Sequence, residues 1–350
     1  MWNFIKKALP RKCLGVDIGI SQVKVVEIYK AGQKKKLENY GQASWSSSLE
    51  KKDVLLFSQN LGQAIKSLIN EAGVKSKQAV FSIPDFLTFF TNLELPSMPK
   101  EELAQAIKYE AKRYIPLPIE EVTLDWQIIE DESSSSGIKI LLVAVPNEIV
   151  RQYREVAKNS HLELVSLEAE AFSLARSLVK ESEKQPLALM DIGARSTVCS
   201  VVDQGVIKTS HSLDMSGNAF TLAVVQGLGI DFDEAENLKK QCGIGLNGEG
   251  GQMVREILSP LLDTALREVK EVLRNFHYQK RKNVERVVIS GGTALLPGLR
   301  EYLKNSLGKE VEIGNPFANI SYPQVLDKTL AEIGPSFAIA AGSAFRGFES

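Results

Sequence analysis

Two aspartates of this chain stand in the same short pattern, Asp-Ile-Gly, at Asp17 and Asp191. Each ends an apolar stretch and precedes a second one, which predicts two strand–turn–strand units. A carboxylate at the end of a buried strand is costly to desolvate, so it needs a partner. Gly19 and Gly193 allow a tight turn whose backbone can approach an anion. The aspartates would repel a phosphate, but they can bind a hydrated Mg²⁺, which keeps its waters and uses few protein carboxylates.

Either unit alone is weak support for chemistry, because an ordinary hairpin with a locally hydrogen-bonded aspartate has the same pattern. Two such turns facing each other, with both carboxylates on one metal ion, would form a nucleotide site. A third segment supports this interpretation. RVVISGGTALLPGL, from Arg286, predicts a buried strand, a pair of glycines and a helix. Gly291 and Gly292 would let an adenine and its ribose lie against bare backbone.

Two commoner nucleotide-binding patterns do not apply. The sequence contains no Walker A pattern, GxxxxGK[ST]. GIGLNG, residues 243–248, has the spacing of the dinucleotide fingerprint, but it follows a predicted helix where that fingerprint follows a strand. We interpret Gly243 as the left-handed end of the helix.

Length and composition limit the classes of protein. The chain has 350 residues, 44% hydrophobic and 24% charged, with 42 Lys and Arg against 43 Asp and Glu. These values predict a soluble globular protein of two domains, without the excess of basic residues that nucleic-acid binding requires. Three scattered cysteines and three histidines predict a reducing cytoplasm and no structural zinc. No apolar run reaches the length of a membrane span.

Strands and helices alternate along the chain, which predicts an α/β fold. We expect two strands in 13–30, a helix near 53–72 and a short strand QAVFSIP. A block over 87–161 predicts strand, helix, strand, strand, helix. The second half predicts strands at 187–207, a long amphipathic helix, strand RVVIS and a last Ala/Gly-rich helix that could pack its backbone closely. The basic run 34–36 is interpreted as a hairpin tip, and 1–12 as a frayed helix, with a helix on a membrane surface as the alternative.

Taken in order, the two strand-DIG units and the strand-GG-x-A-x-x-PG unit resemble the phosphate 1, phosphate 2 and adenosine motifs of the actin-like ATPases. Four segments resemble, more narrowly, the PilM family, which are FtsA-like proteins of type IV pilus assembly. These segments are GVDIGISQVKVVEI, LPSMPKEELAQAIKYEAKRYIPLPIEEVTLDWQII, MDIGARST and GLREYLKNSLGKEVEIGNPF. The resemblance spans nearly the whole chain. It implies an α/β, actin-like (ribonuclease H-like) ATPase fold of two lobes with an FtsA-type inserted subdomain.

The resemblance also implies where the parts of the chain begin and end. They are an N-terminal segment, 1–12; the first lobe or subdomain 1A, 13–86 and 162–186 with the C-terminal helix 335–350; the inserted subdomain 1C, 87–161; the second lobe or subdomain 2A, 187–235 and 285–334; and subdomain 2B, 236–284.

The site residues follow from the same resemblance, position by position. AENLK matches the segment that reaches ribose and adenine, through Glu236 and Lys239, although an exposed ion pair would have the same spacing. Glu170 in EAEAFSLA matches the water-activating position, with Glu168 as a second candidate, and an ordinary helix-start carboxylate would look the same. Asp17 and Asp191 would hold Mg²⁺ through water. The expected contacts to ATP are Gly19, Ser21, Gln22, Gly193, Arg195, Ser196, Gly217, Glu236, Lys239, Gly291, Gly292 and Thr293.

The resemblance implies a cytoplasmic ATP-binding scaffold of type IV pilus or related type II secretion assembly, with hydrolysis left open. Its partner would be the inner-membrane protein PilN, which would hold it at the membrane. The cytoplasmic N-terminal peptide of PilN would bind near the first lobe and the inserted subdomain. Other pilus assembly proteins and self-association are further candidate interactions. The alternative is an FtsA-type cell-division protein that polymerises at the membrane, but the chain stops at Ser350 without the usual linker and amphipathic helix. A sugar or acid kinase of this fold would need a larger substrate-binding elaboration.

Overall fold

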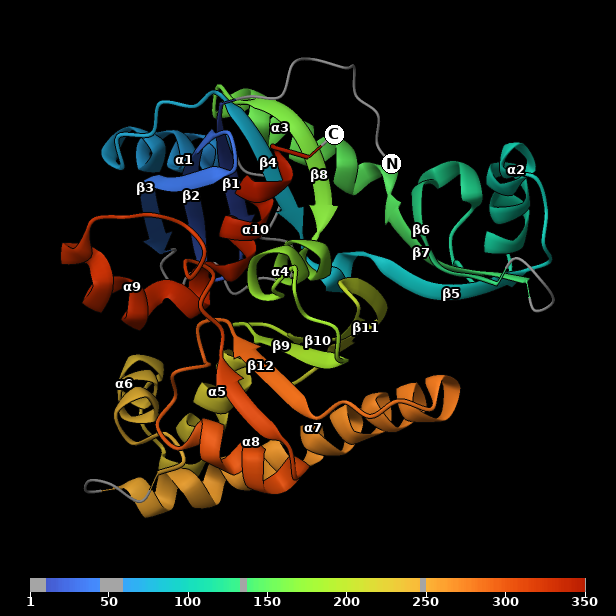
Figure 1. The fold of residues 1–350 in the computed structure, drawn as a ribbon. Coiled ribbons are helices and arrows are strands. Elements are labelled where there is room, and N and C mark those ends of the chain that lie inside the picture. Colours follow the sequence, from blue (N-terminus) through green and yellow to red (C-terminus); the bar gives the residue numbers. More distant parts are fainter. Residues whose placement is uncertain (1–10, 45–58, 133–136, 246–249, 350) are drawn as a thin grey trace. The chain divides into compact units, whose positions relative to one another are not determined.

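A computed structural model describes residues 11–44, 59–132, 137–245 and 250–349 (Figure 1). The chain divides into two compact units, and each has a five-stranded sheet. Unit 1 contains 1–176, 206–210 and 339–350, and unit 2 contains 177–205 and 211–338. No helix in the described part of the chain is long and apolar enough to cross a membrane. Residues 1–10 of the helix expected over 1–12 lie outside the described residues.

The sheet of unit 1 has the strand order β3-β2-β1-β4-β8. β1 pairs antiparallel with β2 and parallel with β4, which pairs parallel with β8. Apolar side chains of β1 and β4 pack with those of α1 and α3 in one core. The strands are β1 (Lys12–Ile18), β2 (Gln22–Ala31), β3 (Lys34–Ser44), β4 (Gln78–Ile83) and β8 (Glu163–Ala169), and the helices are α1 (Gln59–Glu71), α3 (Asn147–Asn159), α4 (Glu170–Leu178) and α10 (Ala338–Arg346).

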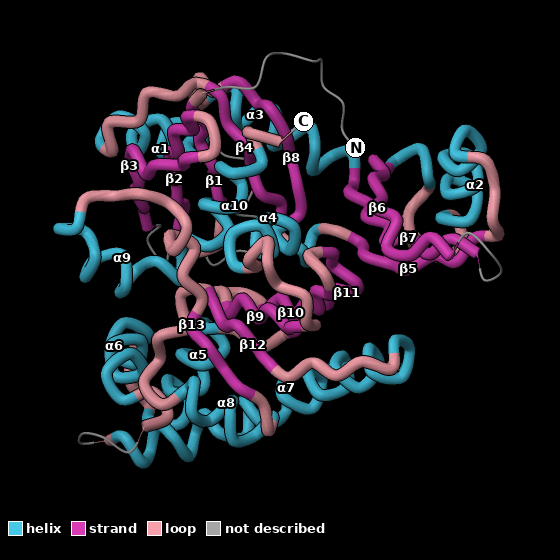
Figure 2. The backbone as a smooth tube through the Cα atoms, viewed as in Figure 1, coloured by secondary structure: helices cyan, strands magenta, loops and turns pink. Residues whose placement is uncertain are grey.

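The last helix, α10, packs its backbone directly on β1 and on α4 (Figure 2). A Cβ atom at Gly15 of β1 would lie 1.8 Å from the carbonyl oxygen of Ala340, and one at Gly342 would lie 1.8 Å from that of Ser173. Close approach of two backbones requires glycine at both contacts. The expectation that the Ala/Gly-rich helix packs closely is confirmed.

A three-stranded sheet, β5-β7-β6, lies within unit 1 with its own core. One face of α2 contributes Leu103, Ile107 and Ala111 to this core. This apolar stripe packs the helix against the three-stranded sheet (Figure 1). The elements are η2 (Asp85–Leu87), β5 (Phe89–Leu95), α2 (Lys100–Ala111), η3 (Ile119–Glu121), β6 (Val122–Glu132) and β7 (Gly137–Pro146).

Unit 2 repeats the central pairing of unit 1, in the strand order β11-β10-β9-β12-β13. β9 pairs antiparallel with β10 and parallel with β12, as β1 does with β2 and β4. The elements are β9 (Leu187–Ile192), β10 (Thr197–Asp203), β11 (Val206–Leu213), α5 (Gly217–Leu228), α6 (Phe232–Cys242), α7 (Gly251–Lys280), β12 (Arg286–Ser290), α8 (Leu299–Leu307), β13 (Glu310–Ile313), η4 (Gln324–Leu326), α9 (Asp327–Ile333) and η5 (Gly334–Phe337).

The α/β alternation, both strand–turn–strand units and the strand–helix–strand–strand–helix block are confirmed. The interpretation of 34–36 as a hairpin tip is wrong, because these lysines begin β3 and the turn lies at 32–33. Lys35 lies 4.5 Å above the ring of Phe345, so part of this basic run covers an aromatic side chain. Gly243 ends α6 with a φ of 55°, positive as expected, but its ψ of −131° is not that of a left-handed helix.

Replacing Gly15 with alanine should destabilise unit 1 strongly, because the added Cβ would meet the backbone of α10 and neither backbone can move alone. We expect a loss of about 3 kcal/mol or more in the free energy of unfolding, measured by chemical denaturation. The matched control is Gly334→Ala, whose Cβ would make ordinary contacts of 3.5–3.6 Å with the ring of Phe317. An equal, small effect of both variants would contradict the packing of α10 on β1.

Candidate functional site

The two Asp-Ile-Gly turns have the same backbone geometry. In the first, the N–H of Gly19 donates to the carbonyl of Gln22 over 2.9 Å, and in the second the N–H of Gly193 donates to that of Ser196 over 3.0 Å. A Cβ on either glycine would lie 3.0–3.1 Å from that same carbonyl oxygen, which is tighter than an ordinary contact. The glycines therefore shape the turns, and their N–H groups close them.

Each aspartate is buried and is paired with a serine on the neighbouring parallel strand. Ser82 of β4 donates to Asp17 over 3.4 Å, and Ser290 of β12 donates to Asp191 over 2.7 Å. Strand register explains why the same pair occurs twice. Asp191 of β9 is paired in register with Ser290 of the parallel strand β12, and Asp17 and Ser82 directly follow the registered pair Val16 and Phe81 of β1 and β4. The two units thus contain the same strand-end carboxylate–hydroxyl pair, which the sequence comparison of turns alone did not find.

Burial raises the pKa of Asp17, while the charge of Lys24 and the hydrogen bond from Ser82 act in the opposite direction. Two groups favour the ionised form, Lys24 on the neighbouring strand β2 and Ser82 through a long hydrogen bond, but together they do not offset the effect of burial. A cation near Asp17 would relieve that cost.

In unit 2 the structure brings together the residues expected at the phosphates and the adenosine. The N–H of Gly217 donates to the carbonyl of Gly193 over 2.8 Å, which ties the start of α5 to the second turn. The N–H of Thr293 donates to the carbonyl of Ile192 over 3.3 Å. A Cβ at Gly217 would lie 2.8 Å from the hydroxyl of Thr293. These contacts join three segments that are far apart in the sequence.

The paired glycines after β12 have different roles. Gly291 has a φ of 89°, and a Cβ there would lie 2.5 Å from the carbonyl oxygen of Ile192, so the fold itself requires glycine. A Cβ at Gly292 would meet nothing within 4 Å. Gly292 therefore presents bare backbone to open space, as a surface for a flat ligand requires.

Glu236 and Lys239 form a buried cluster with α5. The Lys239 ammonium, 5% exposed, donates to the carbonyl of Gly217 over 2.9 Å, to the hydroxyl of Thr221 over 2.8 Å and to Glu236 over 2.6 Å. Burial lowers the pKa of Lys239 more than Glu236 raises it. Burial acts to raise the pKa of Glu236, but the hydrogen bonds from Lys239 and Thr221 leave it lowered. The exposed ion pair considered from the sequence is wrong for Lys239.

The two candidate water-activating carboxylates have different surroundings. Glu168, on β8, accepts hydrogen bonds from Ser173 and Arg176. Glu170 is the first residue of α4, where the N–H of Ala171 donates to the buried carboxylate of Asp85 over 3.2 Å. Asp85 thus caps the helix that begins with Glu170. Glu168 thus forms an ion pair with Arg176, which gives its carboxylate a structural role.

The remaining predicted residues lie on the same two turns. The side-chain amide of Gln22 donates to the hydroxyl of Ser44 over 3.3 Å, and Ser21, Arg195 and Ser196 lie within the turns themselves. Unit 1 contains five of the predicted site residues, Asp17, Gly19, Ser21, Gln22 and Glu170. Unit 2 contains all the others.

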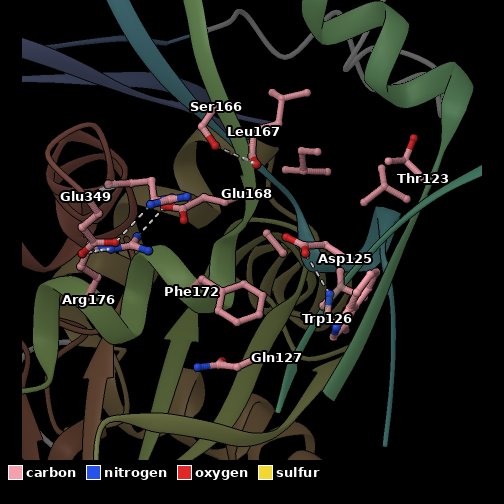
Figure 3. Close-up of a pocket in the computed structure, with 15 residues that line it drawn as sticks. Thr123, Asp125, Trp126, Gln127, Ser166, Leu167, Glu168, Phe172, Arg176 and Glu349 are labelled. Atoms are coloured by element: carbon pink, nitrogen blue, oxygen red, sulfur yellow. Dashed lines mark hydrogen bonds and ion pairs between the residues drawn. The ribbon is translucent and has the colours of Figure 1, made fainter. Parts of the chain in front are cut away.

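A second feature of unit 1 is a pocket of about 340 Å³ between the three-stranded sheet and β8. Figure 3 shows Arg176 between Glu168 and Glu349, with Phe172, Asp125 and Trp126 around the cavity. Arg176 donates to Glu168 over 2.7 Å and to Glu349 over 2.9 Å, which fixes α4 to the C-terminal residues. The sequence did not predict this pocket, because its lining comes from five separate segments.

The residues present fit a nucleotide with a hydrated divalent cation. Each unit has a buried carboxylate at a strand end and a closed turn, and unit 2 also has an open glycine surface. Such a ligand needs groups of these kinds. Within the described ranges no three His, Cys, Asp or Glu side chains gather to hold a metal ion by themselves. A cation here would depend on water and phosphate for most of its ligands, as Mg²⁺ does.

Comparison with known proteins identifies the family. The family model described as "Type IV pilus assembly protein PilM" matches residues 15–348. This chain belongs to the PilM family. The solved structure "PilM-PilN type IV pilus biogenesis complex" is similar to it with a TM-score of 0.85 and 28% identity, covering 97% of this chain and 100% of that one.

The PilM family is related to the division protein FtsA. FtsA of Streptococcus pneumoniae is 20% identical over 86% of this chain and 75% of its own length. FtsA of Agrobacterium fabrum is 23% identical over 59% of this chain, and the match spans about half, 50%, of that protein. MreB5 of Spiroplasma citri bound to AMPPNP shares the fold, with a TM-score of 0.52 at 14% identity. The α/β actin-like ATPase fold is therefore confirmed, and relatives with this fold bind nucleotide.

The variant Gly292→Ala tests whether Gly292 is required for ligand binding or for the fold. Because its Cβ would meet nothing within 4 Å, we expect a change in stability of less than about 1 kcal/mol. The same methyl group would occupy the space of an adenosine, so the affinity for ATP should fall at least about tenfold, measured by calorimetry. Unchanged affinity in this variant would contradict the assignment of Gly292.

Lys239→Met should destabilise unit 2 by about 1–3 kcal/mol in chemical denaturation, because it leaves Glu236, Gly217 and Thr221 without their buried donor. Lys240→Met is the matched control. Lys240 lies 3.1 Å from the same Glu236, but its side chain is 66% exposed, so its loss should cost less than about 0.5 kcal/mol. Equal effects of the two variants would contradict the buried cluster.

Proposed function

We propose that this protein is a cytoplasmic ATP-binding scaffold of type IV pilus assembly, or of the related type II secretion machinery. One Mg-ATP would be held by both Asp-Ile-Gly turns and by the glycines after β12. The cytoplasmic N-terminal peptide of a PilN-type inner-membrane protein would bind in the pocket of unit 1. Through that partner the scaffold would act at the inner face of the membrane.

The single observation that best supports nucleotide binding is the repeated strand-end pair, Asp17 with Ser82 and Asp191 with Ser290. A buried carboxylate is costly to desolvate, and a nearby cation offsets that cost. Its occurrence at equivalent positions of two units is expected if both carboxylates serve one ligand. Mg²⁺ would supply charge neutralisation for the phosphates, and the two aspartates would hold its waters.

For hydrolysis, the candidate residue is Glu170. Glu170 stands at the start of a helix capped by Asp85, which holds its backbone in place. A carboxylate there could orient and deprotonate a water, but phosphoryl transfer depends on how several groups are positioned together. We therefore propose binding with weak hydrolysis or none.

The pocket of unit 1 has the features of a site for an extended peptide. β6 and β8 are the outer strands of their sheets, and both contribute to the lining. Outer strands offer backbone N–H and C=O groups to an added strand, and a pocket between them can take alternate side chains. Trp126 and Phe172 provide apolar surface at the two sides (Figure 3). The similar PilM structure was solved as a complex with PilN.

An FtsA-type division protein that polymerises at the membrane is the alternative function, and the sequence relation to FtsA favours it. The family match over residues 15–348 favours the pilus scaffold. Filament formation on lipid vesicles by the purified protein alone would support the division protein.

Asp17→Asn and Asp191→Asn should each lower the affinity for Mg-ATP at least about tenfold, because each removes one charge from the proposed cation site. Asp17→Asn should also stabilise the ligand-free protein at pH 7. The pKa of Asp17 is raised in the folded state, so ionising it costs stability as the pH rises through that pKa. The gain should vanish below about pH 3.8, where the carboxyl is protonated in both states. Full affinity in either variant would refute the nucleotide site.

Trp126→Ala should weaken binding of a PilN-type N-terminal peptide at least about tenfold in fluorescence anisotropy, since a tryptophan in a pocket is a frequent hot spot. Tyr109→Ala is the control, because Tyr109 is 74% exposed on α2 and does not line the pocket. The same loss in both variants, or in neither, would place the peptide elsewhere.

A further inference from the structure

The pocket of unit 1 contains a carboxylate of the chain itself between two arginines. Glu349 lines the pocket beside Arg176 (Figure 3), and Arg346 lines it too. Oε1 of Glu349 accepts a hydrogen bond from Nε of Arg176 over 2.9 Å, and Oε2 lies 3.6 Å from a guanidinium nitrogen of Arg346. Each oxygen thus faces one guanidinium group. Planar guanidinium groups are well suited to bind carboxylates in this way.

The two arginines are held more firmly than the carboxylate between them. Their side chains are 18% and 19% exposed, whereas the side chain of Glu349 is 48% exposed. Arg176 also donates to Glu168 over 2.7 Å and to the carbonyl of Gly342 over 3.3 Å, so it has partners without Glu349. Phe348 is buried. A rotation of the Glu349 side chain, with Phe348 in place, would therefore open both guanidinium groups to a ligand.

The charges at this end of the pocket leave room for one carboxylate that the fixed residues do not supply. Arg176 and Arg346 carry two positive charges, and Glu168 offsets one of them. Among the described residues Arg346 has a single ion-pair partner, Glu349, at the long distance of 3.6 Å. A half-exposed ion pair of this kind contributes little to stability. A ligand carboxylate can therefore replace Glu349 at small cost and give Arg346 a closer partner.

We propose that Arg176 and Arg346 form an anion subsite of the pocket, which Glu349 occupies in the ligand-free protein. The ligand of this subsite is an Asp or Glu side chain of the bound peptide, which displaces Glu349. The subsite itself stands on the fold of unit 1, whereas the peptide as its ligand rests on the proposed function. Glu349 thus acts as a competitor of the peptide.

The anion subsite also determines which way the peptide lies. Asp125, on β6, lines the pocket on the side away from Arg176 (Figure 3). A carboxylate of the peptide is repelled by Asp125 and attracted by the two arginines, so complementary charge selects one orientation. The acidic residue of the peptide should lie next to α4 and α10, and an apolar residue should lie against Trp126.

The test in the full chain compares two peptides. One is the cytoplasmic N-terminal peptide of a PilN-type protein, and the other is the same peptide with each Asp or Glu replaced by its amide. In fluorescence anisotropy at low salt, we expect the acidic peptide to bind about five- to tenfold more tightly. Glu349→Gln should raise the affinity for the acidic peptide about two- to fivefold, because the competing charge is gone.

Arg346→Met should abolish the preference for the acidic peptide, and Arg346→Lys, which keeps the charge, should restore part of it. The matched control is Arg151→Met. Arg151 is an exposed arginine of α3 that does not line the pocket, so its loss should leave the preference unchanged. Equal affinities of the acidic and amide peptides for the wild-type protein and for Glu349→Gln would overturn the inference and leave the proposed peptide site standing.

A second measurement needs no partner. In the Glu349→Gln protein, N-acetylglutamic acid α-amide should shift the Nε–H NMR signals of Arg176 and Arg346 with saturation, and the glutamine analogue should not. No shift with the glutamate analogue would overturn the anion subsite. A saturable shift in a protein that binds neither peptide would support the subsite, and would contradict both the peptide as its ligand and the proposed peptide site.

Discussion

The proposed nucleotide site depends on a carboxylate placed where a buried strand ends, next to a serine hydroxyl of the neighbouring strand. The pair occurs twice, and in both places the hydroxyl comes from the parallel neighbour of the aspartate strand. The turn after each aspartate is closed by the glycine N–H, so the carboxylate is held rigidly at the sheet edge. A buried charge held in this way is costly to desolvate, and a bound cation would offset that cost.

The same edge of the sheet in unit 1 serves both proposed ligands. β8 leads into α4, and this helix begins with Glu170, the candidate for water activation. Further along the same helix, Phe172 and Arg176 line the pocket proposed for the peptide. A peptide that moved α4 would therefore act on the carboxylate at its start. The ion pairs of Arg176 with Glu168 and Glu349 oppose such movement, so the helix is held at both ends.

Much of this could be predicted from local patterns. The Asp-Ile-Gly turns, the paired glycines and the Ala/Gly helix have signals within a few residues, and all were found. Ser82 and Ser290 were missed because their role comes from strand register, although a lone serine in an apolar strand, as in VFSIP and VVIS, was an available signal.

Other parts could not be predicted because they have no local pattern. The pocket is assembled from β4, β6, β7, β8, α4 and the C-terminal residues, and no short segment contains all of its lining. The basic run 34–36 follows Gly32 closely enough to be interpreted as the hairpin tip, whereas Gly32, with a φ of 59°, lies in the turn just before it.

The central claim is that two equivalent turns form one nucleotide site, and the stoichiometry of binding tests it most directly. Titration of Mg-ATP into the wild-type protein by calorimetry should give one site per chain, with an affinity that falls when Mg²⁺ is removed. Two independent sites per chain, or no binding, would contradict the account.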